Sequence, residues 1–143
     1  MSNVQQTLSI IKPDAVERSL SEKIKNEFKN NNFNILREKK VKISKSEAEK
    51  FYQVHQAKPF YNDLCEYLSS GPIVVMILER NEAVTENRKL MGATDPTKAE
   101  EGTLRKKFGI SIDKNSVHGS DSLENAKKEI DFFLKINYFY KFL

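Results

Sequence analysis

The sequence predicts one domain of the α/β or α+β sandwich class, and three observations support this. The chain has 143 residues, enough for a single domain to bury about 70% of the surface that its unfolded form exposes. Hydrophobic residues make up 38% and charged residues 31%, with five Gly and four Pro, so collagen-like chains are excluded and disorder along the whole length is not expected. Segments with strand patterns alternate with segments of helical periodicity, and their spacing alone favours a parallel sheet. We expect one domain over residues 1–143.

The first part of the chain contains two predicted strands and two predicted helices. Residues 4–11 favour β-structure and stop at Pro13, which cannot donate a hydrogen bond to a sheet. Apolar side chains on one face predict a helix over residues 22–28. Residues 35–43 predict a second strand, and the S-x-x-E pattern of residues 44–47 predicts a capping box that opens another helix.

Three further elements are predicted in the middle of the chain. Residues 60–68 carry an apolar side chain at every fourth position before a Gly-Pro pair, the pattern of a short helix and its end. Residues 73–78 are an unalternated apolar run, which is typical of a strand covered on both faces, so we place it in the middle of the sheet. Asn81 is the candidate N-cap of a helix that ends at Gly92.

The last third predicts a long loop and a helix. Residues 93–107 are polar and contain turn signals, and loops of this length usually have a function. Residues 123–134 place their apolar side chains on one helical face, with Ser120 and Asp121 as candidate N-caps. We find no internal repeat and no low-complexity linker.

Charge and cysteine content limit the partners and the compartment. The net charge of +4 permits anionic partners such as a nucleotide, a nucleic acid or a membrane, without selecting one. Cys65 is the single cysteine, so no internal disulfide can form, and no Cys/His cluster has zinc-ligand spacing. The N-terminus lacks the pattern of a signal peptide, and the apolar run at 73–78 is too short to span a bilayer. We therefore expect a cytoplasmic protein with no membrane partner.

His118 is the main candidate for chemistry. It lies beside Gly119 and just before the last predicted helix, whose N-terminus would favour a phosphate. On the residues alone it could be a turn residue, a metal ligand, a general base or a nucleophile. As a nucleophile it needs an acceptor for its second ring nitrogen, and Glu129 is a candidate because Asp121 and Glu129 are slightly more than two helical turns apart. The other histidine, His55, is interpreted as a partly exposed helix residue.

Seven motifs in order give a more specific indication. The segment at 115–121, Asn-Ser-Val-His-Gly-Ser-Asp, resembles the active-site signature of nucleoside diphosphate kinases, and the similarity extends from about residue 7 to residue 133. The other six motifs are IKPDAVER at 11–18, KPFY at 58–61, SGPIV at 70–74, NR at 87–88, GATDP at 92–96 and GTLR at 102–105. Their shared order is far more specific than any one motif.

The resemblance implies a ping-pong phosphoryl transfer between nucleoside tri- and diphosphates. His118 would attack the γ-phosphate and hold it as a phosphohistidine. Glu129 would orient the imidazole, with Ser120 close to that pair. Lys12 would neutralise the transferring phosphoryl group and reach the sugar hydroxyls, with Tyr52 near it.

The resemblance also implies the nucleotide-binding residues and the metal. Arg88 and Thr94 would hold the β-phosphate side, Arg105 the γ-phosphate, and Asn115 the ribose 3′-OH. The base would stack on Phe60, with Leu64 and Ile112 as further apolar contacts. Mg²⁺ would enter with the polyphosphate, and Asp121 is at most a water-mediated partner.

The family's fold and assembly complete what the resemblance implies. The fold is ferredoxin-like βαββαβ, a four-stranded antiparallel sheet covered by helices, and relatives assemble as tetramers or hexamers, so we expect a homo-oligomer. This chain departs from many relatives at Lys106, Lys107 and Asp113, which are not among the residues to which the resemblance gives chemical roles. The aromatic tail at 136–143 resembles short-tailed bacterial members, and we expect it to pack on its own domain or on a subunit partner.

Less specific interpretations remain open on the residues alone. Phe60 could be a core residue, Lys12 a solvated strand end and Arg105 part of an ordinary charged loop. The basic composition also permits a nucleic-acid-binding or scaffold domain of the same fold, although nucleic acid is not expected as the main ligand. A histidine phosphocarrier that donates to proteins is a third possibility, but an apolar base site would serve no purpose there.

Overall fold

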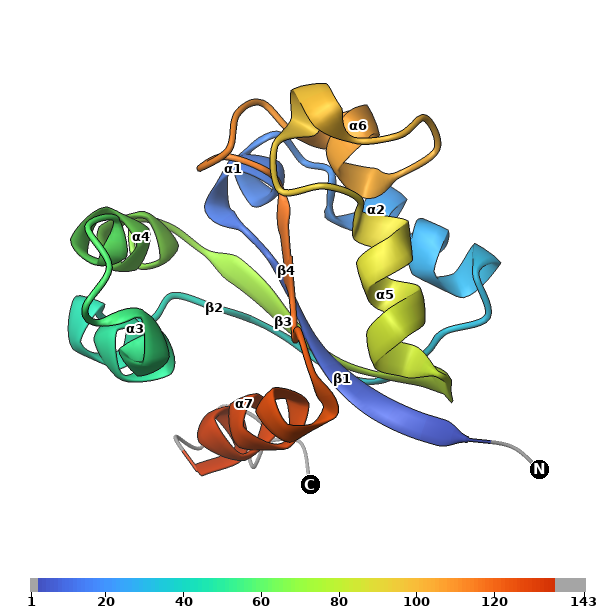
Figure 1. Cartoon of the computed structure of the whole chain (residues 1–143), viewed down its shortest axis with the longest axis horizontal. Coiled ribbons are helices and arrows are strands. Elements are labelled where there is room, and N and C mark those ends of the chain that lie inside the picture. Colours follow the sequence, from blue (N-terminus) through green and yellow to red (C-terminus); the bar gives the residue numbers. More distant parts are fainter. Residues whose placement is uncertain (1–2, 136–143) are drawn as a thin grey trace.

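The computed structural model describes residues 3–135, which form four strands, seven α-helices and two short 3-10 helices (Figure 1). The elements are β1 (Val4–Ile11), α1 (Pro13–Glu17), α2 (Ser21–Asn30), β2 (Asn34–Val41), α3 (Lys45–Phe51), η1 (Gln53–His55), α4 (Tyr61–Leu68), β3 (Ile73–Asn81), α5 (Ala83–Met91), η2 (Pro96–Lys98), α6 (Leu104–Phe108), β4 (Val117–Gly119) and α7 (Leu123–Lys135). The aromatic tail at 136–143 lies outside the described residues.

The four strands form one antiparallel sheet in the order β2-β3-β1-β4. This order and the βαββαβ connectivity confirm the ferredoxin-like fold. The parallel sheet favoured by spacing alone is wrong, because a long helical connection can return the chain in either direction and local spacing does not record which. The run at 73–78 belongs to β3, which lies in the middle of the sheet as expected.

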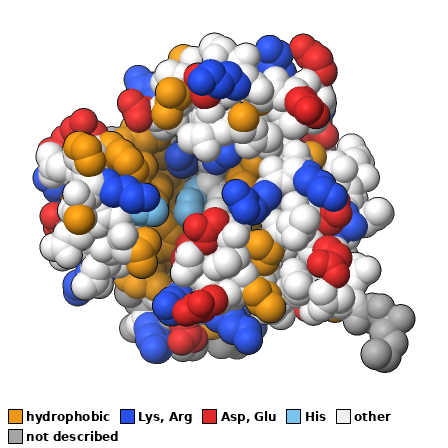
Figure 2. Space-filling view, viewed as in Figure 1, with side chains coloured by type: hydrophobic (Ala, Val, Ile, Leu, Met, Phe, Trp, Pro, Cys, Tyr) orange, Lys and Arg blue, Asp and Glu red, His pale blue; other side chains and the backbone are white. Residues whose placement is uncertain are grey.

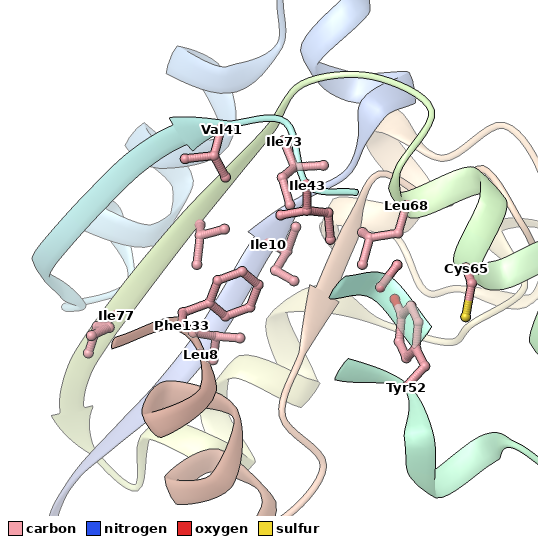
Figure 3. Packing of buried hydrophobic residues seen from close by; sticks show 12 residues of the cluster. Leu8, Ile10, Val41, Ile43, Tyr52, Cys65, Leu68, Ile73, Ile77 and Phe133 are labelled. Carbon is pink, nitrogen blue, oxygen red and sulfur yellow. The ribbon is translucent and has the colours of Figure 1, made fainter. Parts of the chain in front are cut away.

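Helices cover both faces of the sheet (Figure 1). Helices α3, α4 and α7 pack on one face, where Phe133 of α7 lies against Leu8 and Ile10 of β1 (Figure 3). Helices α2 and α5 pack on the other face, around Phe28 and Met76. The alternation of side chains along a strand therefore sends successive residues of β1 and β3 into two different cores.

The structure confirms the predicted N-cap of α3, but the N-caps of α5 and α7 differ from the predicted ones. Ser44 and Glu47 form the expected capping box of α3, with both reciprocal bonds present. Asn81 is not the N-cap of α5, because it ends strand β3 and its side chain accepts a bond from the Asn3 backbone; Glu82 occupies the cap position with a left-handed φ of 55°.

The start of α7 is also one or two residues later than expected. The sequence favours Ser120 and Asp121 as N-caps, but the Ser122 hydroxyl accepts the bond from the Asn125 N–H instead. Ser120 is thereby free to turn its hydroxyl toward the body of the helix. The predicted loop at 93–107 contains η2 and most of α6. None of the helices within residues 3–135 is long and apolar enough to cross a membrane.

Candidate active site

A pocket of about 500 Å³ opens where α4, η1, β4 and the start of α7 meet. This volume lies within the range of small-molecule sites. Figure 2 shows histidine side chains inside a hollow bordered by hydrophobic side chains and by Lys and Arg. Most of the residues predicted from the family motifs line it: Lys12, Tyr52, Phe60, Leu64, Thr94, Arg105, Ile112, Asn115, His118, Asp121 and Glu129.

His118 reaches the pocket from the short strand β4. It pairs with Ile10 of β1, and its ring packs edge-on against Phe51 at a centroid distance of 5.3 Å. The Nε2 atom lies 2.8 Å from Oε1 of Glu129. Because an ionised carboxylate only accepts hydrogen bonds, the ring proton belongs on Nε2. Nδ1 has no hydrogen-bond partner among residues 3–135, so its lone pair is available to a ligand.

Ser120 connects this pair to the sheet. Its Oγ donates to Oε1 of Glu129 at 3.0 Å and accepts from the Leu8 N–H at 3.3 Å. Ser120 is fully buried. Glu129 therefore has two donors on one carboxylate oxygen, and the expected contact between Glu129 and the histidine loop is present.

Lys12 is buried rather than solvated. Only 6% of it is exposed, and its Nζ donates to Oδ1 of Asn115 at 2.9 Å. Burial and the nearby Arg105 guanidinium lower the pKa of Lys12 to about 8, against opposing effects from Asp14 and Asp113. The interpretation of Lys12 as a solvated strand end is wrong.

Arg105 is also buried, with 9% of it exposed. Its guanidinium donates to the carbonyl oxygens of Gly92 at 2.9 Å and Val117 at 3.0 Å. Burial, together with Arg88, lowers the pKa of Arg105 to about 10. These contacts fix the guanidinium beside His118, so Arg105 is not part of an ordinary charged loop.

Arg88 lies next to the pocket rather than in it. It is exposed on α5 and lines an adjacent hollow of about 410 Å³. Thr94, Arg105 and Asp121 line both spaces. A long anion such as a polyphosphate could therefore extend from Lys12 past Arg105 to Arg88.

Apolar side chains form the outer part of the pocket. Phe60 is 48% exposed and Ile112 is 56% exposed, while Leu64 is half-buried. The interpretation of Phe60 as a core residue is therefore wrong. Deeper in, the buried Tyr52 ring lies 6.1 Å from that of His118, and burial followed by the charge of Glu129 raises the pKa of Tyr52.

Sequence reasoning missed His55 as a pocket residue. It lies on η1, and its ring is 6.1 Å from Tyr52 and 6.2 Å from Phe60. Its Nδ1 is buried without a partner in the described part of the chain, and burial followed by the Lys58 charge lowers the pKa of His55. The available signal was the i, i+3 spacing from Tyr52, which places both side chains on one helical face.

Asp121 offers one carboxylate at the junction of the two spaces. Its Oδ1 accepts from the Asn125 amide at 2.6 Å, and this bond lowers the pKa of Asp121. No group of three or more His, Cys, Asp or Glu side chains within residues 3–135 could hold a metal ion. A divalent cation here would need most of its ligands from a bound anion.

Comparisons with known proteins agree with this geometry. The family model described as "Nucleoside diphosphate kinase" matches residues 5–138. A protein of that name from a Nitratiruptor species is 56% identical over 91% of this chain and 95% of its own length. One from Campylobacter jejuni is also 56% identical, over 94% of this chain and 98% of its own length.

Solved structures give the same result. The Aquifex aeolicus nucleoside diphosphate kinase superposes with a TM-score of 0.89 and 38% identity, over 91% of this chain and 94% of the other. The enzyme from Encephalitozoon cuniculi gives a TM-score of 0.88 and 35% identity, over 91% of this chain and 88% of the other. These matches do not favour the nucleic-acid-binding or scaffold alternative. By a match over most of its length in both sequence and fold, the chain belongs to the nucleoside diphosphate kinase family.

Proposed function

We propose that the protein moves the γ-phosphate of a nucleoside triphosphate, typically ATP, onto a nucleoside diphosphate through a phosphohistidine at His118. Its family makes it a nucleoside diphosphate kinase, a phosphotransferase of nucleotide metabolism. The observation that supports His118 as the carrier is the Glu129 contact at Nε2, which leaves Nδ1 unpaired among the described residues in a cationic pocket.

The two half-reactions are the reverse of each other. Nδ1 of His118 attacks the γ-phosphorus, an N–P bond forms, and the bond to the bridging β-phosphate oxygen breaks to release the diphosphate. A second diphosphate then attacks the phosphohistidine through a terminal β-phosphate oxygen, and the N–P bond breaks. The carboxylate of Glu129 stabilises the ring proton on Nε2 while the imidazole carries the phosphoryl group.

Three cationic side chains would stabilise the charge that develops during transfer. Lys12 neutralises the phosphoryl group, Arg105 holds the γ-phosphate, and Arg88 with Thr94 holds the β-phosphate side. Arg105 enters the reaction already oriented, because backbone carbonyls bind its guanidinium. A preorganised cation needs little reorganisation at the moment of transfer.

The remaining side chains would bind the nucleoside. The exposed ring of Phe60 stacks on the base, and Leu64 and Ile112 contact its edges. This site accepts any base, because every base has a π face. Asn115 bonds the ribose 3′-OH, and Tyr52 lies near Lys12 and the sugar.

Mg²⁺ fits this site as a cation held mainly by phosphate oxygens. Asp121 would approach it through water, and the Asn125 bond that lowers the pKa of Asp121 keeps that carboxylate ionised. When bound, Mg²⁺ would neutralise part of the negative charge of the polyphosphate.

The wider setting is part of the same proposal. Residues 1–143 form one nucleoside diphosphate kinase domain that works in the cytoplasm as a tetramer or hexamer of identical chains. Its partners are nucleoside tri- and diphosphates, with no membrane and with nucleic acid not a main ligand. The buried free thiol of Cys65 suits a reducing compartment. Light scattering of the purified chain measures the oligomeric state directly.

The test is incubation with γ-labelled ATP and Mg²⁺, followed by a chase with unlabelled diphosphates. We expect acid-labile, base-stable label on the wild-type chain that a diphosphate removes. His118→Asn should abolish the label, whereas the matched control His55→Asn, which alters the other histidine of the same pocket, should keep it. A wild-type chain that stays unlabelled refutes the proposed function.

A further inference from the structure

Both ends of Lys12 are bonded to the loop that precedes His118. The Lys12 backbone N–H donates to the carbonyl oxygen of Ser116 at 2.8 Å. The Lys12 ammonium donates to Oδ1 of the preceding residue, Asn115, at 2.9 Å. The position of Lys12 therefore depends on how Asn115 and Ser116 are held.

Ser116 has an unusual backbone conformation. Its φ is 76°, and the Val117 N–H donates across it to the carbonyl of Asn115 at 3.0 Å, which closes a tight three-residue turn. A side-chain-bearing residue rarely adopts this conformation, which persists only where the surrounding structure imposes it. Ser116 is fully buried.

The Ser116 hydroxyl supplies that restraint. Its Oγ donates to Oδ2 of Asp14 at 3.1 Å and accepts from Nη2 of Arg18 at 3.2 Å. Arg18 also forms an ion pair with Asp14 at 3.1 Å and donates to the carbonyl of Phe108. Charge-assisted bonds of this kind are stronger than neutral ones.

Tyr67 completes the network from α4. Its hydroxyl donates to Oδ1 of Asp14 and accepts from the Asp14 N–H at 2.9 Å. Asp14 is 6% exposed, and both oxygens of its carboxylate accept hydrogen bonds. We call Asp14, Arg18, Tyr67 and Ser116 the Ser116 clamp.

We propose that the Ser116 clamp positions the active site: Ser116 and Asp14 hold Lys12 and Asn115 at fixed positions relative to His118. The clamp connects α1, α4 and the turn before β4, and in the described part of the chain it lies behind the pocket, since none of its four residues lines it. It acts on a ligand only through Lys12 and Asn115. This inference rests on the proposed function.

The proposed role predicts a larger effect on the rate than on binding. Without the Ser116 hydroxyl, nothing in the clamp restrains the strained turn, and Lys12 shifts with it. A displacement of a fraction of an ångström at a group that acts mainly in the transition state lowers kcat more than it raises KM.

The experiment compares Ser116→Ala and Ser116→Gly with the wild-type chain. Glycine accepts the positive φ without strain, so Ser116→Gly keeps the test valid if another variant does not fold. We expect both to slow phosphohistidine formation about tenfold, with KM changed less than about threefold. Ser69→Ala is the control, because it removes a serine hydroxyl that bonds the carbonyl oxygens of Cys65 and Glu66 and no residue of the clamp.

Asp14→Asn gives a second readout that a merely structural residue would not move. The charged groups that face Lys12 are Arg105, Asp14 and Asp113. Removing the Asp14 charge should move the alkaline limb of kcat/KM to lower pH, because that charge raises the pKa of Lys12. Ser116→Gly keeps all three charges, so it should move the limb less.

Wild-type rates in both Ser116 variants, or an unshifted alkaline limb of kcat/KM in Asp14→Asn, would overturn the clamp proposal alone. A wild-type chain without phosphohistidine overturns the proposed function as well, so the two failures are distinguishable.

Discussion

The Nε2 atom of His118 lies 2.8 Å from Oε1 of Glu129, and the same oxygen accepts a bond from Ser120. Glu129 comes from α7 and His118 from β4, so packing of the helix on the sheet sets this distance. One carboxylate oxygen thereby determines both the tautomer and the orientation of the imidazole.

Glu129→Gln should slow phosphohistidine formation about ten- to a hundredfold without a large loss of stability. The amide keeps the shape, but it weakens stabilisation of the imidazolium and can present its NH₂ to Nε2, which moves the ring proton to Nδ1. Rapid-quench kinetics measures the rate. Glu124→Gln on the exposed face of the same helix should match the wild type. A Glu129→Gln variant at the wild-type rate would contradict this role.

The pH dependence should show a fall in kcat/KM above about pH 8, where Lys12 loses its proton. Burial has lowered its pKa from 10.5 to about 8. Between these two values the unfolded chain binds more protons than the folded chain, so the contribution of Lys12 to stability rises with pH while activity falls. Urea unfolding over the same pH range separates the two effects.

Lys12→Arg is the control for that profile. An arginine keeps its charge through the alkaline range, so the limb near pH 8 should disappear even if the rate is lower. A limb that persists unchanged in Lys12→Arg would mean that another group causes it.

The sequence predicted local features of the fold better than distant ones. The capping box at Ser44 and the buried strand at 73–78 depend on neighbouring residues, so patterns located them. The sheet direction depends on how distant segments return, and spacing alone suggested the wrong one. Asn81 failed as a cap because a partner far away in the sequence, Asn3, occupies its side chain.

The same division applies to the site. Motif resemblance predicted which residues gather, and Lys12, Asn115, His118 and Glu129 do lie together. It could not predict their environment, since burial is a property of the whole packed chain. The lowered pKa of Lys12 and the place of His55 in the pocket both arise from tertiary packing.

Binding of the base can be tested with a matched pair of isoleucines. Ile110 and Ile112 are each 56% exposed in the same loop, but only Ile112 lines the pocket. Ile112→Ala should raise KM about two- to tenfold at nearly constant kcat, because it removes contact made equally in the ground and transition states. Steady-state kinetics should show no change in Ile110→Ala. Equal KM values in both variants would exclude Ile112 from the base site.

A side chain added at Gly119, beside His118, should destabilise the fold. A Cβ at Gly119 would collide with the ends of two buried side chains of α5, at Nδ2 of Asn87 and, 2.6 Å away, at Cε of Met91. Gly119→Ala should lower the free energy of unfolding by about 1–3 kcal/mol, because either these two buried side chains or β4 must move. Movement of β4 would displace His118 and slow phosphohistidine formation.

Gly71→Ala is the matched control for that substitution. Its Cβ would meet only Cβ of Pro13 at 3.7 Å, an ordinary contact, so stability should change by less than about 1 kcal/mol. Urea unfolding and rapid-quench kinetics on the two variants separate close packing at β4 from a general effect of replacing glycine. If Gly119→Ala proved as stable and as active as Gly71→Ala, the side chains of Asn87 and Met91 would move aside easily, and close packing against α5 would not fix the position of His118.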